Sequence, residues 1–318
     1  MRDMKHLRLL TVAFLSIAFF ACKEEATDTP FVIEGITTEN YPKVDGSTST
    51  EPLQTIIACK LLGGSYYWRQ LLSSDYTWAI QPNYEDIPFS FFTERIETSQ
   101  THNSFINLID KNADFILSAR KMSDDEKAYA ANAGVTLIET PIALDAFIFI
   151  DNPGNPVNSL TTKQIQDIYM GNITNWKEVG GSDAKINPYV RNANSGSQEL
   201  MESLVMKGLV MPAWPEEMLT SMMQAFTTIR NDVNGLCYTV YYYKELIVRD
   251  NDLVKTIAVD GIYPDKNTIK NRSYPFTAEV YAVIRTDQDK ASMAYKLYEL
   301  LQTKSGKKVI SESGYFPN

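Results

Sequence analysis

The stretch from Tyr189 to Glu199, YVRNANSGSQE, places an arginine ahead of a serine–glycine–serine turn and a helix-prone run. Arg191 carries a permanent positive charge on a planar fork of donors, and Ser195 and Ser197 add hydroxyl groups. The first turn of a helix also leaves about four backbone N–H groups unpaired and carries a partial positive charge. These groups together suit a tetrahedral oxyanion, which Arg191 can hold with two parallel hydrogen bonds.

Two further segments share this design of a strand, a hydroxyl-rich turn and a helix: Gly46-Ser47-Thr48-Ser49-Thr50 and Thr101-His102-Asn103-Ser104. Each turn alone could simply cap its helix, because serine and threonine are common N-cap residues. Arg191 alone could instead pair with a nearby acid. Three such turns in one chain favour a common anion site, since turns of this kind meet at the carboxyl ends of strands in open α/β folds.

The elements that would position these turns alternate along the chain, which predicts α/β layers. Residues 66–86 are rich in aromatic side chains and are predicted to form an elaborated loop with a short helix. The predicted strands are 115–118, 136–141, 146–150, 187–191, 235–242 and 276–284. The predicted helices are 53–62, 105–111, 124–133, 160–170, 198–209 and 288–303, and the helix at 160–170 is expected to be capped by Thr161 or Ser159.

The composition is that of an ordinary globular protein, with 318 residues and 44% hydrophobic residues, enough for one large or two medium domains. The net charge of −9 argues against nucleic acid as a partner, because its binders present basic faces. An anion must therefore be attracted by positively charged or N–H and O–H groups close to it, because the overall charge of the protein repels it. With only two histidines in the chain, we expect neither a His-rich metal site nor a cofactor, although carboxylates alone could bind Mg²⁺.

The N-terminus predicts export. Three basic residues precede a short apolar run, Leu9 to Phe20, which is typical of a signal peptide covering residues 1–21. Phe19-Phe20-Ala21-Cys22 resembles the lipobox of bacterial lipoproteins and predicts lipidation of Cys22, the alternative being a plain secretory peptide. Residues 22–31 form a polar tether. The two remaining cysteines, Cys59 and Cys237, lie in apolar stretches and are predicted to be buried thiols rather than a disulfide.

Four stretches carry a resemblance to the phosphate-binding proteins of bacterial ABC phosphate transporters, in the periplasmic binding-protein superfamily. They are VDGSTSTEPL (44–53), ADFILSARKMSDDE (113–126), NPVNSLTTKQIQDIYMGNITNWKEVGG (155–181) and RNANSGSQE (191–199). The third is the most specific, and the resemblance covers nearly the whole chain after the signal peptide. Lys23-Glu24-Glu25 also resembles a surface-export signal of lipoproteins.

The resemblance assigns ligand-binding residues by position. The matching residues are Ser47, Thr48, Ser49, Thr101, Asn103, Arg191, Ser195, Gly196 and Ser197. Members of the family place an aspartate after the strand 115–118, and this chain has Arg120 near that place, which either binds the anion or points to solvent. Losing that acceptor puts in doubt the usual rejection of sulfate. His102 is either a further donor or a solvated loop residue.

The fold that the resemblance implies is a two-lobed α/β periplasmic binding-protein (type II) fold with a ligand cleft between the lobes. Lobe I would comprise residues 32–142 and 261–318, and lobe II residues 143–260. The implied function is that of a non-enzymatic, lipid-anchored, monomeric binding protein in the periplasm or on the surface of a Gram-negative bacterium. It would capture phosphate or a related oxyanion and deliver it to an ABC permease or a surface partner. A phosphate-ester hydrolase and a non-transport sensor or surface protein remain the alternatives.

Overall fold

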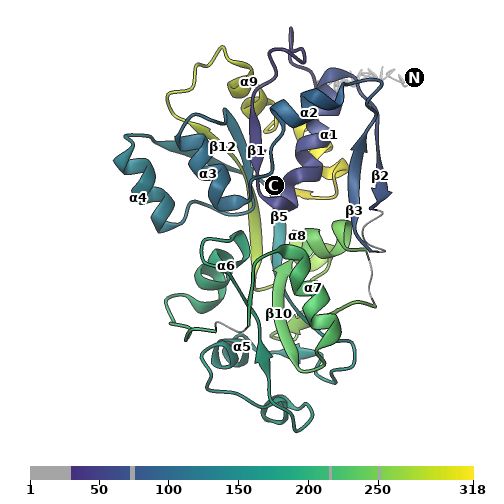
Figure 1. Ribbon diagram of the computed structural model, residues 1–318, viewed down its shortest axis with the longest axis vertical. Coiled ribbons are helices and arrows are strands. Elements are labelled where there is room, and N and C mark those ends of the chain that lie inside the picture. The colour runs from purple at the N-terminus through teal and green to yellow at the C-terminus, as the bar shows by residue number, and fades with distance from the viewer. Residues whose placement is uncertain (1–29, 72–75, 215–216, 250–251) are drawn as a thin grey trace, which may run out of the picture.

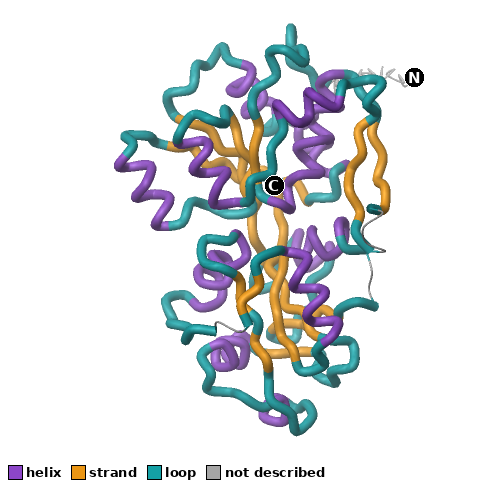
Figure 2. Tube along the Cα trace, in the orientation of Figure 1, coloured by secondary structure: helices purple, strands orange, loops and turns teal. Residues whose placement is uncertain are grey.

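The computed structural model describes residues 30–71, 76–214, 217–249 and 252–318. Its helices and strands form two lobes that are stacked along the long axis and joined by long central strands (Figures 1 and 2). The predicted two-lobed α/β fold is confirmed. The predicted signal peptide, Cys22 and most of the polar tether lie outside the described residues.

Strand β5 (Leu137–Asp151) connects the two lobes. Its first part, Leu137 to Ala146, pairs antiparallel with β12 (Thr277–Arg285), and its second part pairs antiparallel with β10 (Gly235–Val240). Two separate strands were predicted here, and that prediction was wrong. Pro141 does not end the strand, because the register shifts beside it, between Val280 and Tyr281 of β12, and the irregularity accommodates the missing N–H donor.

The first lobe contains both termini of the described chain and the sheet β1–β4–β12–β5. Its strands besides β5 and β12 are β1 (Val44–Gly46), β4 (Phe115–Ser118) and β13 (Phe316–Pro317). Its helices are the 3-10 turn η1 (Thr48–Thr50), α1 (Glu51–Leu62), α2 (Phe89–Arg95), α3 (Thr101–Ile109), α4 (Asp124–Asn132), α9 (Met293–Leu300) and α10 (Lys304–Glu312).

The second lobe is built around β10 and the second half of β5. Its other strands are β6 (Ser159–Leu160), β7 (Asn187–Pro188), β8 (Val190–Arg191), β9 (Met218–Leu219) and β11 (Lys255–Val259). Its helices are α5 (Thr162–Tyr169), the 3-10 turn η2 (Trp176–Val179), α6 (Gly196–Leu200), the π-helix η3 (Met201–Met206), α7 (Met222–Asn231), the π-helix η4 (Tyr243–Ile247) and α8 (Lys266–Lys270).

The chain crosses between the lobes at two places, and both lie further along the sequence than the predicted lobe boundaries at residues 143 and 261. Strand β5 changes partners only at Phe147. Residues after 261 still pack on the second lobe, because the Tyr274 hydroxyl donates to the carbonyl of Phe147 and the ring of Phe276 lies 6.1 Å from that of Phe149. The second crossing is therefore strand β12.

The aromatic segment 66–86 is an antiparallel hairpin, and the predicted loop with a short helix was wrong. Strands β2 (Tyr66–Gln70) and β3 (Trp78–Pro82) pair along their whole length. Half-buried and exposed residues alternate from Tyr66 to Arg69, but the run of aromatic residues hides this alternation in the sequence. The hairpin extends from the first lobe towards the second, where Thr77 forms a bridge with Val248 (Figure 1).

Helix starts follow the sequence signals. Pro52 stands in the first turn of α1, Ser123 and Glu126 form a capping box on α4, and Thr161 and Gln164 form one on α5. Thr161, rather than Ser159, is the cap. The predicted helix 198–209 starts earlier, with Ser195 as its N-cap, and its second half is the π-helix η3.

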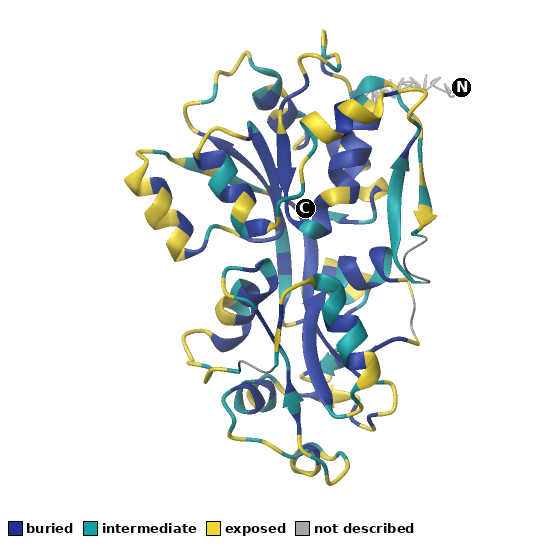
Figure 3. Ribbon diagram, viewed as in Figure 1, coloured by how far each residue is buried: buried dark blue, intermediate teal, exposed yellow. Residues whose placement is uncertain are grey.

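The core follows the central strands, and Figure 3 shows buried residues concentrated there. Every residue of β5 from Ile142 to Asp151 is buried, since helices cover both faces of the sheet. Cys59 and Cys237 are free buried thiols, which confirms the prediction. Across the residues described, no helix is both long and apolar enough to cross a membrane.

Candidate anion-binding site

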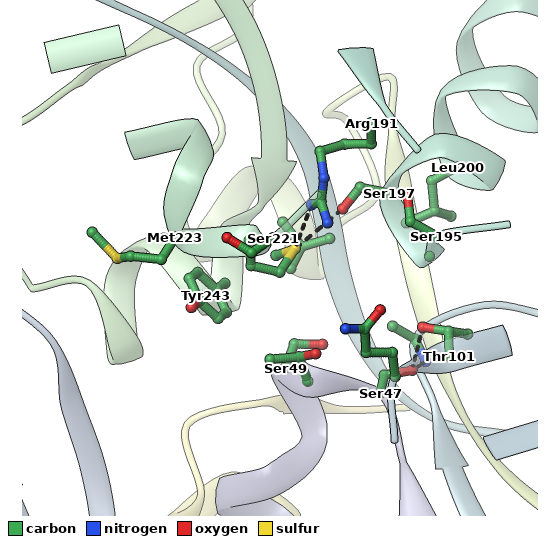
Figure 4. A pocket seen from close by; sticks show the side chains of 16 residues that line it. Ser47, Ser49, Thr101, Arg191, Ser195, Ser197, Leu200, Ser221, Met223 and Tyr243 are labelled. Carbon is green, nitrogen blue, oxygen red and sulfur yellow. Dashed lines mark hydrogen bonds between the residues drawn. The ribbon is translucent and has the colours of Figure 1, made fainter. Parts of the chain in front are cut away.

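The three hydroxyl-rich turns lie around one cavity between the lobes, with a volume of about 180 Å³. The first turn follows β1, the second begins α3, and the third lies between β8 and α6. Figure 4 shows Arg191 on one side of this space and Ser47 and Ser49 on the opposite side. The predicted residues that line it are Ser47, Thr48, Ser49, Thr101, Arg191, Ser195, Gly196 and Ser197.

The first-lobe side is held in place by its own hydrogen bonds. Ser47 Oγ lies 2.8 Å from Thr101 Oγ1 and accepts a hydrogen bond from the backbone N–H of Ala119 at 2.9 Å. Gly46 is needed here, because a Cβ atom would lie 2.5 Å from the carbonyl oxygen of Leu117. Within the described chain, the hydroxyls of Thr48 and Ser49 have no hydrogen-bond partner, so they can bind a ligand.

The second-lobe side is the start of α6. Ser195 Oγ accepts a hydrogen bond from the backbone N–H of Gln198 at 3.2 Å, so its hydroxyl caps the helix. The N–H groups of Gly196 and Ser197 fall in the first helical turn, where no intrahelical partner exists. Ser197 Oγ lies 3.4 Å from Met222 Sδ, a weak acceptor. This side therefore offers mainly N–H and O–H donors to the cavity.

Arg191 is the only charged side chain that lines the cavity within the described ranges. It is 5% exposed, and its Nε donates to the carbonyl oxygen of Leu219 at 3.1 Å. Its Nη1 lies 3.1 Å from Met222 Sδ, and no carboxylate of the described residues pairs with it. Burial lowers the pKa of the guanidinium, yet arginine stays charged in proteins. The site thus has a buried cation without a counter-ion in the described part of the chain.

The two sides of the cavity approach each other closely. A Cβ atom on Gly196 would lie 2.5 Å from Thr101 Oγ1, so only glycine permits this contact between the lobes. Close by, Arg120 Nη2 lies 3.3 Å from the carbonyl oxygen of Asn194, a second contact between the lobes. The two lobes are therefore in direct contact beside the cavity.

Two predicted ligand residues do not line the cavity. Both Nη atoms of the Arg120 guanidinium donate hydrogen bonds to the buried carboxylate of Glu126, at 2.7 and 2.8 Å. The positive charge of Arg120 is therefore already compensated. Asn103 is exposed on α3. His102 Nδ1 also lies 3.0 Å from Glu126, and not in the cavity. We therefore correct the prediction and remove Arg120 and Asn103 from the candidate ligand residues.

Several lining residues were missed. They are Gln100, Ala119, Leu200, Ser221, Met222, Met223, Val240 and Tyr243. Ser221 could have been found, because it is the N-cap of α7 and accepts from the N–H of Gln224. Tyr243 lies on a π-helix at the end of β10, and no local pattern marks it as a site residue.

The described part of the chain has no cluster of three or more His, Cys, Asp or Glu residues able to hold a metal ion. The cavity lining among these residues also has no histidine and no carboxylate. The arrangement can therefore bind an anion through donors, but it lacks a general base beside the serine hydroxyls.

The chain belongs to the PBP superfamily, since the family model described as a PBP superfamily domain matches residues 77–302. It is 24% identical over 219 residues to the phosphate-binding protein PstS of Borreliella burgdorferi, covering 67% of this chain and 74% of that protein. It is 27% identical over 225 residues to PstS of Staphylococcus epidermidis, covering 68% of this chain and 67% of that protein. These relatives confirm the resemblance inferred from the motifs.

Solved structures agree with the fold. A putative phosphate ABC transporter substrate-binding protein from Clostridium perfringens, solved with bound phosphate, superimposes with a TM-score of 0.60 at 21% identity. An ABC-type phosphate transport receptor from Vibrio cholerae gives a TM-score of 0.61 at 23% identity. Each comparison covers 86% of this chain and 98% of the other. At this identity the likeness establishes the two-lobed fold alone.

Proposed function

We propose that this protein captures inorganic phosphate, or a similar tetrahedral oxyanion, between its two lobes. The observation that carries the proposal is Arg191, a cation that is 5% exposed, has no counter-ion among the described residues and faces a cavity ringed by hydroxyl groups. A buried unpaired charge is costly, and an anionic ligand would compensate it. The hydroxyls of Thr48 and Ser49 and the N–H groups at the start of α6 would complete the shell of donors.

The same lining favours binding over hydrolysis. Attack by a serine hydroxyl on a phosphate ester requires a base within hydrogen-bond reach, and the described lining residues include neither histidine nor carboxylate. Among the described residues that line this cavity, no carboxylate repels a fully deprotonated anion. Sulfate is therefore expected to compete with phosphate more effectively than in a site that contains an aspartate.

We further propose that the protein acts outside the cytoplasm, anchored by a lipid on Cys22, and delivers the anion to a permease. The names of the relatives, phosphate-binding protein PstS and phosphate ABC transporter substrate-binding protein, support the transport role. The lipobox-like Phe19–Cys22 stretch supports the anchor. Metabolic labelling with an alkyne fatty acid checks it: label should be incorporated into the wild type and lost in Cys22→Ser.

Titration calorimetry with inorganic phosphate tests the binding. Arg191→Ala is expected to weaken phosphate binding at least about tenfold, because a charged donor pair to a desolvated anion contributes about 1.5–3 kcal/mol. Arg191→Lys should recover only part of the loss, since lysine keeps the charge but not the planar fork. Lys307→Ala, which removes one positive charge from an exposed position on α10, is the control and should bind as the wild type does.

The hydrolase and the surface or sensor protein each predict a different result from the binding protein. Turnover of a phosphate ester by the purified protein would indicate a hydrolase instead of a binding protein. No heat with phosphate, sulfate or molybdate would favour a surface or sensor protein that has lost the ligand. Unchanged phosphate affinity in Arg191→Ala, with the variant folded, would contradict the site as described.

A further inference from the structure

A second cavity, also of about 180 Å³, adjoins the anion-binding cavity. The two share Thr48 and Tyr243 as lining residues. The far side of the second cavity is formed by Glu51 of α1, Trp78 of the β2–β3 hairpin and Ile247 of η4. Inorganic phosphate is small enough for the first cavity alone, so it would leave this adjoining space unfilled.

Glu51 supplies a negative charge to the second cavity. Its side chain is exposed to solvent, and partial desolvation by the surrounding protein raises the pKa of its carboxyl. Within the described residues, no lysine, arginine or hydrogen-bond donor pairs with this carboxylate. The lining of the second cavity therefore includes an exposed acidic group with no partner in the described part of the chain, whereas the unpaired cation of the first cavity is buried.

Tyr243 lines both cavities, the one that contains Arg191 and the one that contains Glu51. It is 6% exposed, and its hydroxyl has no hydrogen-bond partner among the described residues. Burial, together with the charge of Glu51, raises its pKa to about 12 against the opposing effect of Arg191, so both charged groups act on the same ring. In Figure 4 Tyr243 and Met223 form one flank of the anion cavity, and Ser195 and Thr101 form the other.

We propose that the two adjoining cavities together bind a phosphate monoester or phosphonate whose organic group ends in an ammonium. This inference rests on the proposed function, since the phosphate group of the ligand would occupy the Arg191 cavity. The ammonium would then lie in the second cavity, where Glu51 provides its counter-charge and the rings of Trp78 and Tyr243 provide cation–π surface. A ligand with a second acidic group there would be repelled by Glu51, and an uncharged one would gain no attraction from it.

Matched pairs of soluble ligands test the charge requirement. Phosphoethanolamine is compared with propyl phosphate, and phosphocholine with 3,3-dimethylbutyl phosphate, which has carbon in place of the quaternary nitrogen. In calorimetric titrations of the wild type, at least one ammonium ligand should bind about tenfold more tightly than its uncharged partner. Glu51→Gln, which keeps the shape of the side chain, should reduce that ratio to within about threefold. Glu94→Gln, an exposed position on α2, is the matched control and should keep the wild-type ratio.

The failures of the two proposals are distinguishable. Phosphate binding with equal affinities within both ligand pairs, or a preference that survives Glu51→Gln, would overturn the ammonium site and leave the anion site standing. Binding of phosphate with no binding of any ester would have the same meaning. If neither phosphate nor any ester binds, both proposals are wrong. Circular dichroism of Glu51→Gln establishes that its fold is retained, so that a changed ratio reports on the cavity.

Discussion

Two arginines with the same exposure, 5%, have opposite surroundings in this protein. Both Nη atoms of Arg120 donate to the carboxylate of Glu126, so this arginine has a structural role. Arg191 has carbonyl and sulfur contacts but no carboxylate among the described residues. Burial is therefore the same for both side chains, and Arg191 at the cavity differs in having no counter-ion among the residues that the structure describes. That difference is the basis for assigning the anion site to Arg191.

Asp145 should make the protein less stable as the pH rises. Burial raises the pKa of its carboxyl to about 7, against 3.8 for the ordinary group, and its Oδ2 has no partner among the described residues. Between about pH 4 and pH 7 the folded protein keeps a proton that the unfolded chain has lost, so the free energy of unfolding falls across this window. Asp145→Asn is expected to raise the free energy of unfolding at pH 8 by about 2–4 kcal/mol and to change it little at pH 4. Urea denaturation at both pH values measures this.

Asp167→Asn is a control of opposite sign. The Lys163 hydrogen bond lowers the pKa of the Asp167 carboxyl, so this carboxylate contributes stability that is present above about pH 4 and lost in acid. Asp167→Asn should therefore lower stability at pH 8. An Asp145→Asn variant that is less stable than the wild type at pH 8 would contradict the assignment of Asp145 as a costly buried acid.

The β2–β3 hairpin connects the first lobe to the second through Arg249. The guanidinium carbon of Arg249 lies 4.2 Å from the ring centre of Trp68 and 4.9 Å from that of Trp78. The backbone N–H of Arg249 also donates to the carbonyl of Tyr76 at 3.2 Å. Since Trp78 and Thr77 line the second cavity, the position of the hairpin determines the shape of that cavity.

Arg249→Met should weaken this connection. Methionine keeps much of the side-chain length but loses the attraction to both rings, so the free energy of unfolding should fall by about 1 kcal/mol, the value expected for an exposed cation–π contact. Urea denaturation followed by tryptophan fluorescence measures the free energy of unfolding. The value for Arg249→Lys should lie between those of the wild type and Arg249→Met. Equal stability of all three proteins would show that the contact contributes nothing.

The arrangement of the two lobes depends on one close contact, between Gly196 and Thr101. The backbone of Gly196 has no positive φ angle, so glycine is needed for space rather than for conformation. The contact brings α6 of the second lobe against the start of α3 of the first. Closing the lobes in this way surrounds the cavity with donors from both sides, as expected for a hinged binding protein.

Gly196→Ala should hinder closure. The added Cβ would lie 2.5 Å from Thr101 Oγ1, so the lobes would have to separate. Phosphate affinity is expected to fall at least about tenfold, because part of the donor shell would be displaced. Small-angle X-ray scattering should then show a smaller decrease in the radius of gyration on adding phosphate than the wild type shows.

A second substitution provides the control for this prediction. Thr101→Ala in the Gly196→Ala background removes the hydroxyl that the new methyl group meets, so ligand-induced compaction should be recovered at saturating phosphate. Compaction equal to that of the wild type in Gly196→Ala alone would mean that the contact does not limit closure.

Local patterns along the chain specify many of the elements of this protein. The strand 115–118, the Pro52 start of α1, the Thr161 cap and the turns around Ser47 and Ser195 all follow from neighbouring residues, because caps and turns are short-range features. The turns that line the cavity were found from the same signals together with the family motifs.

Which of these groups share a cavity depends on contacts in three dimensions. Arg191 and Arg120 look alike in the sequence, and their different roles depend on Glu126, which reaches only one of them. Tyr243, Glu51 and Trp78 are far apart in the chain and meet through the hairpin and the π-helix η4. The physical reason is that a charge counts as unpaired, and a hydroxyl as free, only relative to its neighbours in space, which spacing along the chain does not specify.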